Sequence, residues 1–113
     1  MALRLVALGA RLVADDRTLI RATDRGLVAR CANPDFAGAI EARGVGILNA
    51  PFDSEALLVL ALDLDRNEDQ RLPPRRELAL LGCKLPLVLQ VQNDHLAESL
   101  LLCLVHGWRD TRR

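Results

Sequence analysis

The chain has 113 residues, half of them apolar, and no formal net charge at neutral pH. This length fits one domain, residues 1–113, with enough apolar side chains for a core. The neutral balance argues against nucleic-acid binding and against an acidic, solvating tail. No apolar run approaches the roughly 20 residues of a membrane-spanning helix, and no signal peptide is recognisable. We therefore expect a cytoplasmic protein that binds neither nucleic acid nor membrane.

Three cysteines, Cys31, Cys83 and Cys103, are widely spaced and include no Cys-x-x-Cys pair. This spacing argues against a zinc site or a redox pair. Cys83 and Cys103 lie in apolar segments, so we expect both to behave as small buried hydrophobic residues. A reducing compartment such as the cytoplasm suits free thiols.

The first half of the chain is predicted to begin with a short helix, residues 2–8, that ends at Gly9. This helix has no polar N-cap, so it resembles the second half of a longer helix. Extended segments and a turn are then expected, in the order 11–14, 18–21, the turn 23–26, and 27–31.

The second half is predicted to contain one long apolar strand, residues 56–64, buried on both faces. A polar surface loop with two prolines is expected at 65–76, followed by a strand at 85–91. The closing helix is predicted at 97–106, because its apolar residues recur at helical spacing, and Gly107 ends it.

Two adjacent carboxylates, Asp15 and Asp16, follow the first extended segment. Side chains alternate in direction along extended chain, so one carboxylate could act as a base while the other orients it or binds a metal. This arrangement suits phosphoryl transfer, in which an acid accepts the proton of the attacking hydroxyl. Taken alone, the pair is more often a polar turn.

Glu41 stands shortly before two glycines, Gly44 and Gly46. A carboxylate supplies the hard oxygen ligand that Mg²⁺ prefers, so Glu41 is a candidate metal ligand. Glycines let backbone N–H groups approach phosphate oxygens, which makes Gly44 and Gly46 candidate cofactor-binding residues. Taken alone, this segment is more often a glycine turn, with an unusual φ or a close backbone approach.

Three stretches, in order, resemble the C-terminal catalytic domain of the HPr kinase/phosphorylase family, and the likeness runs from residue 2 to about residue 106. Residues 11–16 resemble the family's R-L-V-A-D-D segment. Residues 40–49 resemble its L-E-I-R-G-L-G-I-I-N signature. Residues 71–86 resemble its R-L…L-G-V-K-[IL]-P block. An unrelated small α/β domain that matches by chance is the least economical interpretation.

The resemblance implies an α/β fold of the P-loop-kinase-like (PEP carboxykinase-like) type, with a mixed sheet and flanking helices. It implies that Asp15 is the catalytic acid/base and that Asp16 supports it. It also implies that Glu41 binds Mg²⁺ and that Arg71 stabilises charge on the transferred group, a task that suits a guanidinium fork.

The implied activity is ATP-dependent phosphorylation of a seryl residue on an HPr-type phosphocarrier, with phosphorolysis as the reverse reaction, in regulation of the phosphotransferase system. Family resemblance also implies a homo-oligomer, namely a hexamer. The alternative is a non-catalytic, degenerate module that binds a phosphocarrier or sister subunits.

One part of the family pattern has no counterpart in the chain. The sequence contains no G-x-x-x-x-G-K-[ST] segment, the Walker A loop that holds nucleotide phosphates. Residues 2–9 resemble the end of the helix that follows this loop, which suggests a truncated member of the short proteobacterial type. Residues 92–95 also replace a basic phosphorolysis loop. We therefore expect this chain alone to be inactive.

Overall fold

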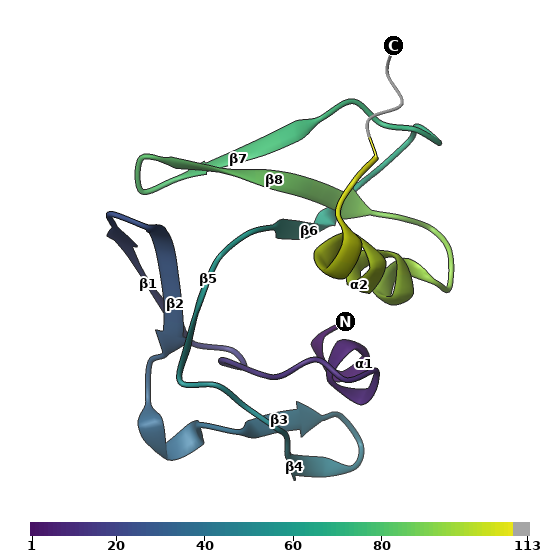
Figure 1. Ribbon diagram of the computed structural model, residues 1–113. Helices are drawn as coiled ribbons and strands as arrows, with labels where there is room; N and C mark the ends of the chain where they lie inside the picture. The colour runs from purple at the N-terminus through teal and green to yellow at the C-terminus, as the bar shows by residue number, and fades with distance from the viewer. Residues whose placement is uncertain (110–113) are drawn as a thin grey trace.

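The structure is a computed structural model and describes residues 1–109 (Figure 1). Its elements are, in order, α1 (Ala2–Ala7), β1 (Thr18–Thr23), β2 (Gly26–Cys31), the 3₁₀ helix η1 (Pro34–Phe36), β3 (Ala39–Ala42), β4 (Gly46–Asn49), β5 (Glu55–Leu57), β6 (Ala61–Asn67), β7 (Arg76–Leu80), β8 (Cys83–Gln90) and α2 (Leu96–His106). Within the described part of the chain, neither helix has the length and apolarity needed to cross a membrane.

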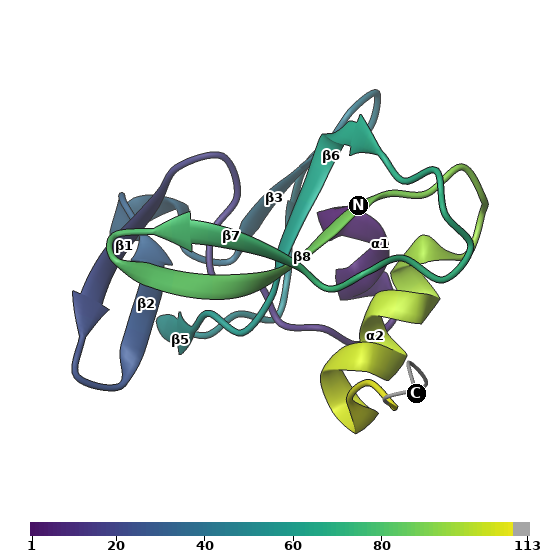
Figure 2. The same ribbon diagram turned by 90° about the horizontal axis from the view of Figure 1, so that it is seen from above.

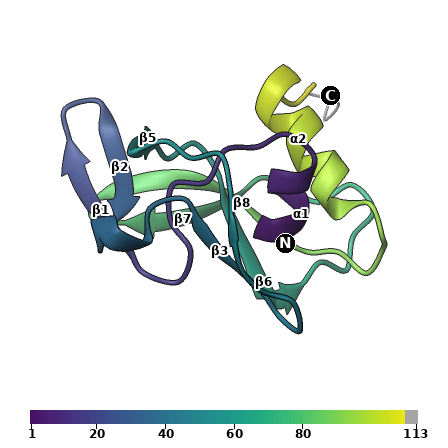
Figure 3. The same ribbon diagram turned by 90° about the horizontal axis from the view of Figure 1, so that it is seen from below.

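The strands form three small sheets. One has the order β1-β2-β5 and is antiparallel throughout. The second is the β3–β4 hairpin, and the third has the order β6-β8-β7, with β6 parallel to β8. Seen from above and from below, the two helices lie side by side at one end of the molecule, and the β1–β2 hairpin lies at the other (Figures 2 and 3).

The core is small and draws on all three sheets and one helix. α2 contributes three buried residues, whereas α1 contributes none. The buried apolar residues are Leu12, Leu27, Ala29, Ile40, Ala42, Leu85, Leu89, Leu96, Ala97 and Leu100. Several of these residues alternate along their strands, as Leu27 and Ala29 do in β2, which is the pattern of strands with one covered face.

Several predicted elements are confirmed. α1 ends at Ala7, and Gly9 follows it with a φ of 110°. The turn predicted at 23–26 joins β1 to β2, and the side chain of Thr23 donates to the carbonyl of Gly26 over 2.8 Å. α2 ends at Gly107, whose φ is 77°.

The long apolar strand predicted at residues 56–64 is wrong. The chain changes sheets inside this run, because β5 pairs with β2 and β6 pairs with β8. The connecting residue Leu58 donates its backbone N–H to Leu27, and none of residues 56–64 is buried. An apolar run indicates that its residues favour burial, but it does not indicate where the chain leaves one sheet and joins another.

Two further boundaries differ from the predictions. Residues 11–14 form no strand, because only Leu12 makes a bridge, to Phe52. The predicted surface loop 65–76 is shorter, since β6 continues to Asn67 and β7 begins at Arg76. The cysteines are also only half-buried, and all three are free thiols.

Candidate functional site

The two acidic segments singled out in the sequence meet in the structure. The backbone N–H of Glu41 donates a hydrogen bond of 3.0 Å to Oδ2 of Asp15, across 26 positions in the sequence. Glu41 lies in β3, where its side chain is exposed between the buried residues Ile40 and Ala42. Burial of these two neighbours therefore directs the Glu41 carboxylate outward, to the same side as Asp15.

The segment that carries Asp15 is held by its upstream residues. Leu12 is buried, donates its N–H to Pro51 over 2.8 Å, and accepts the N–H of Asp53 over 2.9 Å. Arg11 adds a bond of 2.7 Å to the carbonyl of Phe52 and an ion pair of 2.9 Å with Asp53. These contacts fix the chain three residues before Asp15.

Asp16 occupies a strained backbone conformation. Its φ is 70°, and the N–H of Arg17 bonds to the carbonyl of Asp15 over 2.8 Å. A hydrogen bond between residues two apart, around a central residue with positive φ, defines a rare and strained γ-turn. Such a conformation costs about 1–3 kcal/mol and persists only where surrounding structure holds it. The turn sends the chain into β1 and leaves both carboxylates beside β3.

These residues line an open cavity of ≈ 500 Å³. Its lining comprises Asp15, Asp16, Arg17, Cys31, Asn33, Phe36, Ala39, Glu41 and Ile47. The lining contains three carboxylates and one guanidinium, so the cavity is acidic overall and attracts cations or hydroxyl donors. The exposed side chains of Phe36 and Ile47 give it an apolar rim.

The other predicted site residues lie elsewhere. Gly44 and Gly46 stand at and beside the turn that joins β3 to β4, with φ values of 87° and 139°. A Cβ atom at either position would meet nothing within 4 Å, so it is the positive φ, and no close approach, that calls for glycine. Arg71 lies in the loop between β6 and β7, and none of the three lines the cavity.

Sequence reasoning missed several lining residues. Asn33 caps η1 by accepting the N–H of Asp35 over 3.0 Å, and its carbonyl accepts from the Cys31 thiol over 3.1 Å. The segment Asn33-Pro34-Asp35 is a capping signature that predicts a short helix start. Phe36 and Ile47 gave no comparable signal, because their place at the rim depends on how β4 and η1 pack.

The cavity supplies hard oxygen donors but no assembled cage. No cluster of three or more His, Cys, Asp or Glu residues poised to hold a metal ion occurs among residues 1–109. Mg²⁺ commonly keeps several waters and uses one or two carboxylates together with substrate phosphates. Glu41 and Asp15, adjacent on one wall of the cavity, fit this sparse kind of site.

Groups with shifted pKa values lie outside the cavity. The side-chain hydrogen bonds with Arg76 lower the pKa of Glu68, and the same pairing raises the pKa of Arg76. Both guanidinium contacts are short, at 2.9 and 2.8 Å. Partial burial raises the pKa of the Cys103 thiol, which keeps it protonated and unreactive at neutral pH.

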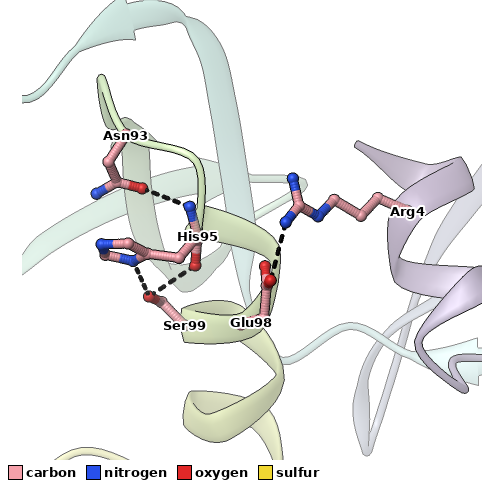
Figure 4. Close-up of polar contacts among 5 residues, drawn as sticks. All are labelled: Arg4, Asn93, His95, Glu98 and Ser99. Atoms are coloured by element: carbon pink, nitrogen blue, oxygen red, sulfur yellow. Dashed lines mark hydrogen bonds and ion pairs between the residues drawn. The ribbon is translucent and has the colours of Figure 1, made fainter.

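A second polar cluster surrounds the start of α2 (Figure 4). Arg4 of α1 pairs with Glu98 over 2.8 Å, and the pKa of Glu98 is lowered first by its own backbone N–H and then by Arg4. His95 donates its N–H to Asn93 and accepts the Ser99 hydroxyl at its carbonyl, each over 3.0 Å. The bonds of His95 order the chain at the start of α2, and the Arg4–Glu98 pair ties the helix to α1.

Comparison with known proteins finds a solved structure with a similar fold. No protein-family model matches the chain, and no curated protein matches it. Among solved structures, it is similar to the one described as the Hpr(Ser) kinase/phosphatase from Coxiella burnetii, with a TM-score of 0.70 and 23% sequence identity. The likeness covers 89% of this chain and 68% of that chain. The expected mixed α/β fold with flanking helices is confirmed by this likeness, which is consistent with the P-loop-kinase-like type.

Proposed function

We propose that the chain is a phosphoryl-transfer domain of the HPr kinase/phosphatase kind, directed at a seryl residue of an HPr-type phosphocarrier. The observation that carries the proposal is the 3.0 Å hydrogen bond from the Glu41 N–H to Asp15, which joins the two acidic motifs at one cavity. The shared fold with an Hpr(Ser) kinase/phosphatase supports it. Regulation of the phosphotransferase system and a cytoplasmic location belong to the same proposal.

Asp15 is the residue that would exchange a proton with the seryl hydroxyl. Its Oδ2 already accepts the Glu41 N–H, whereas Oδ1 has no hydrogen-bond partner among residues 1–109, so Oδ1 is the more open oxygen to accept a proton. General bases of this kind must come within about 2.6–3.2 Å of the hydroxyl oxygen. Asp16 would support this role through the γ-turn, which sets the direction of the Asp15 carboxylate.

Glu41, with Asp15 beside it, would hold Mg²⁺. When bound, the ion would neutralise charge that develops on the transferred phosphoryl group. Arg17 also lines the cavity, and its guanidinium would suit phosphate oxygens. Arg71, expected to play that part, lies in the β6–β7 loop, so its proposed role requires an approach of that loop or of another subunit.

ATP is the proposed phosphate donor in the complete enzyme, but we expect this chain by itself to bind it weakly. The 113 residues include no G-x-x-x-x-G-K-[ST] segment, whose backbone N–H groups and lysine cradle the phosphates. Gly44 and Gly46 lie outside the cavity lining. Phosphoryl transfer depends almost entirely on positioning and electrostatics, so loss of the cradle removes most of the catalysis.

The missing cradle favours a second candidate function, in which the chain binds a phosphocarrier or sister subunits without catalysis. One experiment separates the two. The chain is mixed with an HPr-type phosphocarrier and MgATP, phosphoserine is measured by mass spectrometry, and binding is measured by calorimetry. Binding with phosphoserine above the level given by Asp15→Ala, even at a low rate, supports the enzyme, and binding with no phosphoserine above that control supports the module. The absence of both contradicts the enzyme and any module that binds the phosphocarrier.

A further inference from the structure

The β1–β2 hairpin carries a concentration of positive charge. Residues 17–31 contain four arginines and one aspartate, a formal net charge of +3, although the whole chain has none. The arginines, all exposed, are Arg17, Arg21, Arg25 and Arg30. Among residues 1–109, their guanidinium groups make one ion pair, from Arg21 to Glu55 at 3.6 Å, which is too long for a hydrogen bond. The hairpin therefore presents positive charge that the chain leaves largely uncompensated.

β1 also has an open edge. It stands at the end of the sheet order β1-β2-β5, and among residues 1–109 its six residues pair with β2 alone. At the pair that continues this register, the N–H of Ala32 donates to the carbonyl of Arg17 over 3.2 Å. Hydrogen-bonded pairs alternate in an antiparallel ladder, so Thr18, Ile20 and Ala22 direct their backbone N–H and C=O groups to the open edge. Figures 2 and 3 show this hairpin at the end of the molecule away from the helices.

One face of the hairpin is both cationic and apolar. Leu19 lies directly opposite Arg30, and Arg21 lies opposite Val28, so these four side chains share a face. We call these four residues the basic face. An open groove of ≈ 220 Å³ is lined by Leu19, Ile20, Arg21 and Arg30. The groove therefore combines two guanidinium groups with apolar residues of the strand that has the open edge.

We propose that β1 is a docking edge for an extended acidic segment of another protein, which adds to the sheet as a further strand. The free backbone groups of β1 would bond to the main chain of that segment, which is how strand addition gains affinity. Side chains alternate, so every second residue of the segment meets the basic face, where a carboxylate would pair with Arg21 or Arg30. The residues between them lie on the face of Ile20 and would be apolar. This inference does not depend on the proposed phosphoryl transfer.

The charge of the edge selects this occupant. If β1 of a second copy paired with β1 of the first, their arginines would lie together on one face, and like charges destabilise a sheet. An anionic membrane offers negative charge to the arginines but no row of backbone groups to the open edge. An extended acidic segment supplies both the charge and the hydrogen bonds.

The test uses the full chain and a fluorescein-labelled octapeptide in which valine alternates with glutamate. We expect a saturable rise in fluorescence anisotropy that weakens as salt is added, because the contact is partly ionic. Arg21→Gln and Arg30→Gln should each raise the dissociation constant about two- to fivefold, the effect of one exposed ion pair. Bound peptide should also slow hydrogen exchange at the amides of Thr18, Ile20 and Ala22, which reports pairing at the edge itself.

Arg43→Gln is the matched control, because Arg43 is an exposed arginine of the β3–β4 turn that makes no ion pair among residues 1–109. It should leave the dissociation constant unchanged, and a peptide in which valine alternates with lysine should not bind. No binding of the glutamate peptide at about 1 mM overturns the proposal.

Three further outcomes would also overturn it. In the first, Arg43→Gln weakens binding as much as Arg21→Gln does, so the attraction is general charge. In the second, bound peptide leaves hydrogen exchange at Ile20 unchanged, so no strand is added. In the third, the chain binds phosphatidylserine vesicles but not the glutamate peptide, which assigns the basic face to a membrane.

Discussion

The backbone N–H of Glu41 is held by the carboxylate of Asp15, 3.0 Å away, although 25 residues separate them in the chain. Removal of this acceptor should be measurable. We expect Asp15→Ala to lower the free energy of unfolding by about 0.5–1.5 kcal/mol and to speed hydrogen exchange at the Glu41 amide. Asp15→Asn keeps an oxygen acceptor, so its effect should be smaller.

The matched control for this change is Asp16→Asn, which removes the neighbouring charge without removing the bond to Glu41. Asparagine also tolerates positive φ. Urea unfolding with amide exchange measures both variants. Equal exchange rates at Glu41 in Asp15→Ala and in the wild type would contradict the contact.

The γ-turn at Asp16 makes a second prediction. Both Asp16→Gly and Asp16→Ala remove the carboxylate, but only glycine adopts a φ of 70° without steric cost. Asp16→Gly should therefore be more stable than Asp16→Ala by about 1–2 kcal/mol in urea unfolding. Alanine at least as stable as glycine at this position would show that the turn is absent in solution.

Alanine substitutions at Gly38 and Gly44 distinguish the cost of a steric clash from the cost of a positive φ. Both have positive φ, 74° and 87°. A Cβ at Gly38 would lie 2.5 Å from Cδ1 of Phe52, whereas one at Gly44 would meet nothing within 4 Å. Gly44→Ala should cost about 1 kcal/mol through φ alone. Gly38→Ala should cost about 1–3 kcal/mol more, because Phe52 must move. Similar losses in thermal unfolding would refute the close packing of Phe52.

Stability in acid should depend on the pair of Glu68 and Arg76. Arg76 lowers the pKa of Glu68, so the unfolded chain binds the proton more readily than the folded one. The stabilising contribution is therefore complete above the ordinary carboxyl pKa of about 4.5 and is lost as the pH falls through the lowered pKa. In acid, the slope of the unfolding free energy against pH should therefore be smaller for Arg76→Gln than for the wild type.

Arg75→Gln is the control for this measurement, because it removes an adjacent arginine that makes no ion pair among residues 1–109. Urea unfolding at several pH values between 3 and 6 gives the slope. If Arg75→Gln reduces this slope as much as Arg76→Gln does, the slope depends on the net charge of the chain and not on the pair of Glu68 and Arg76.

Local signals in the sequence predicted where helices end better than they predicted which strands pair. Gly9 and Gly107 mark the helix ends because their positive φ is a local requirement. The division of residues 56–64 between two sheets was not predictable, since it depends on contacts of β5 with β2 and of β6 with β8.

The candidate site shows the same limit. Motif resemblance pointed to Asp15, Asp16 and Glu41, and the structure brings all three to one cavity. Their catalytic and metal-binding roles stay predictions. Resemblance also pointed to Arg71, which lies in a loop away from the cavity lining, while Phe36 and Ile47 entered it only through tertiary packing. A residue's match to a sequence motif does not determine how far it lies from the cavity.

The most direct test of the account is a titration of the isotopically labelled chain with an HPr-type phosphocarrier, followed by amide NMR. We predict shifts that saturate and are largest at the residues that line the cavity, led by Asp15, Arg17 and Glu41, with much weaker shifts in Asp15→Ala. The β6–β7 loop should respond less. Shifts confined to α2, or no shifts at millimolar phosphocarrier, would contradict the proposal that this cavity receives the carrier.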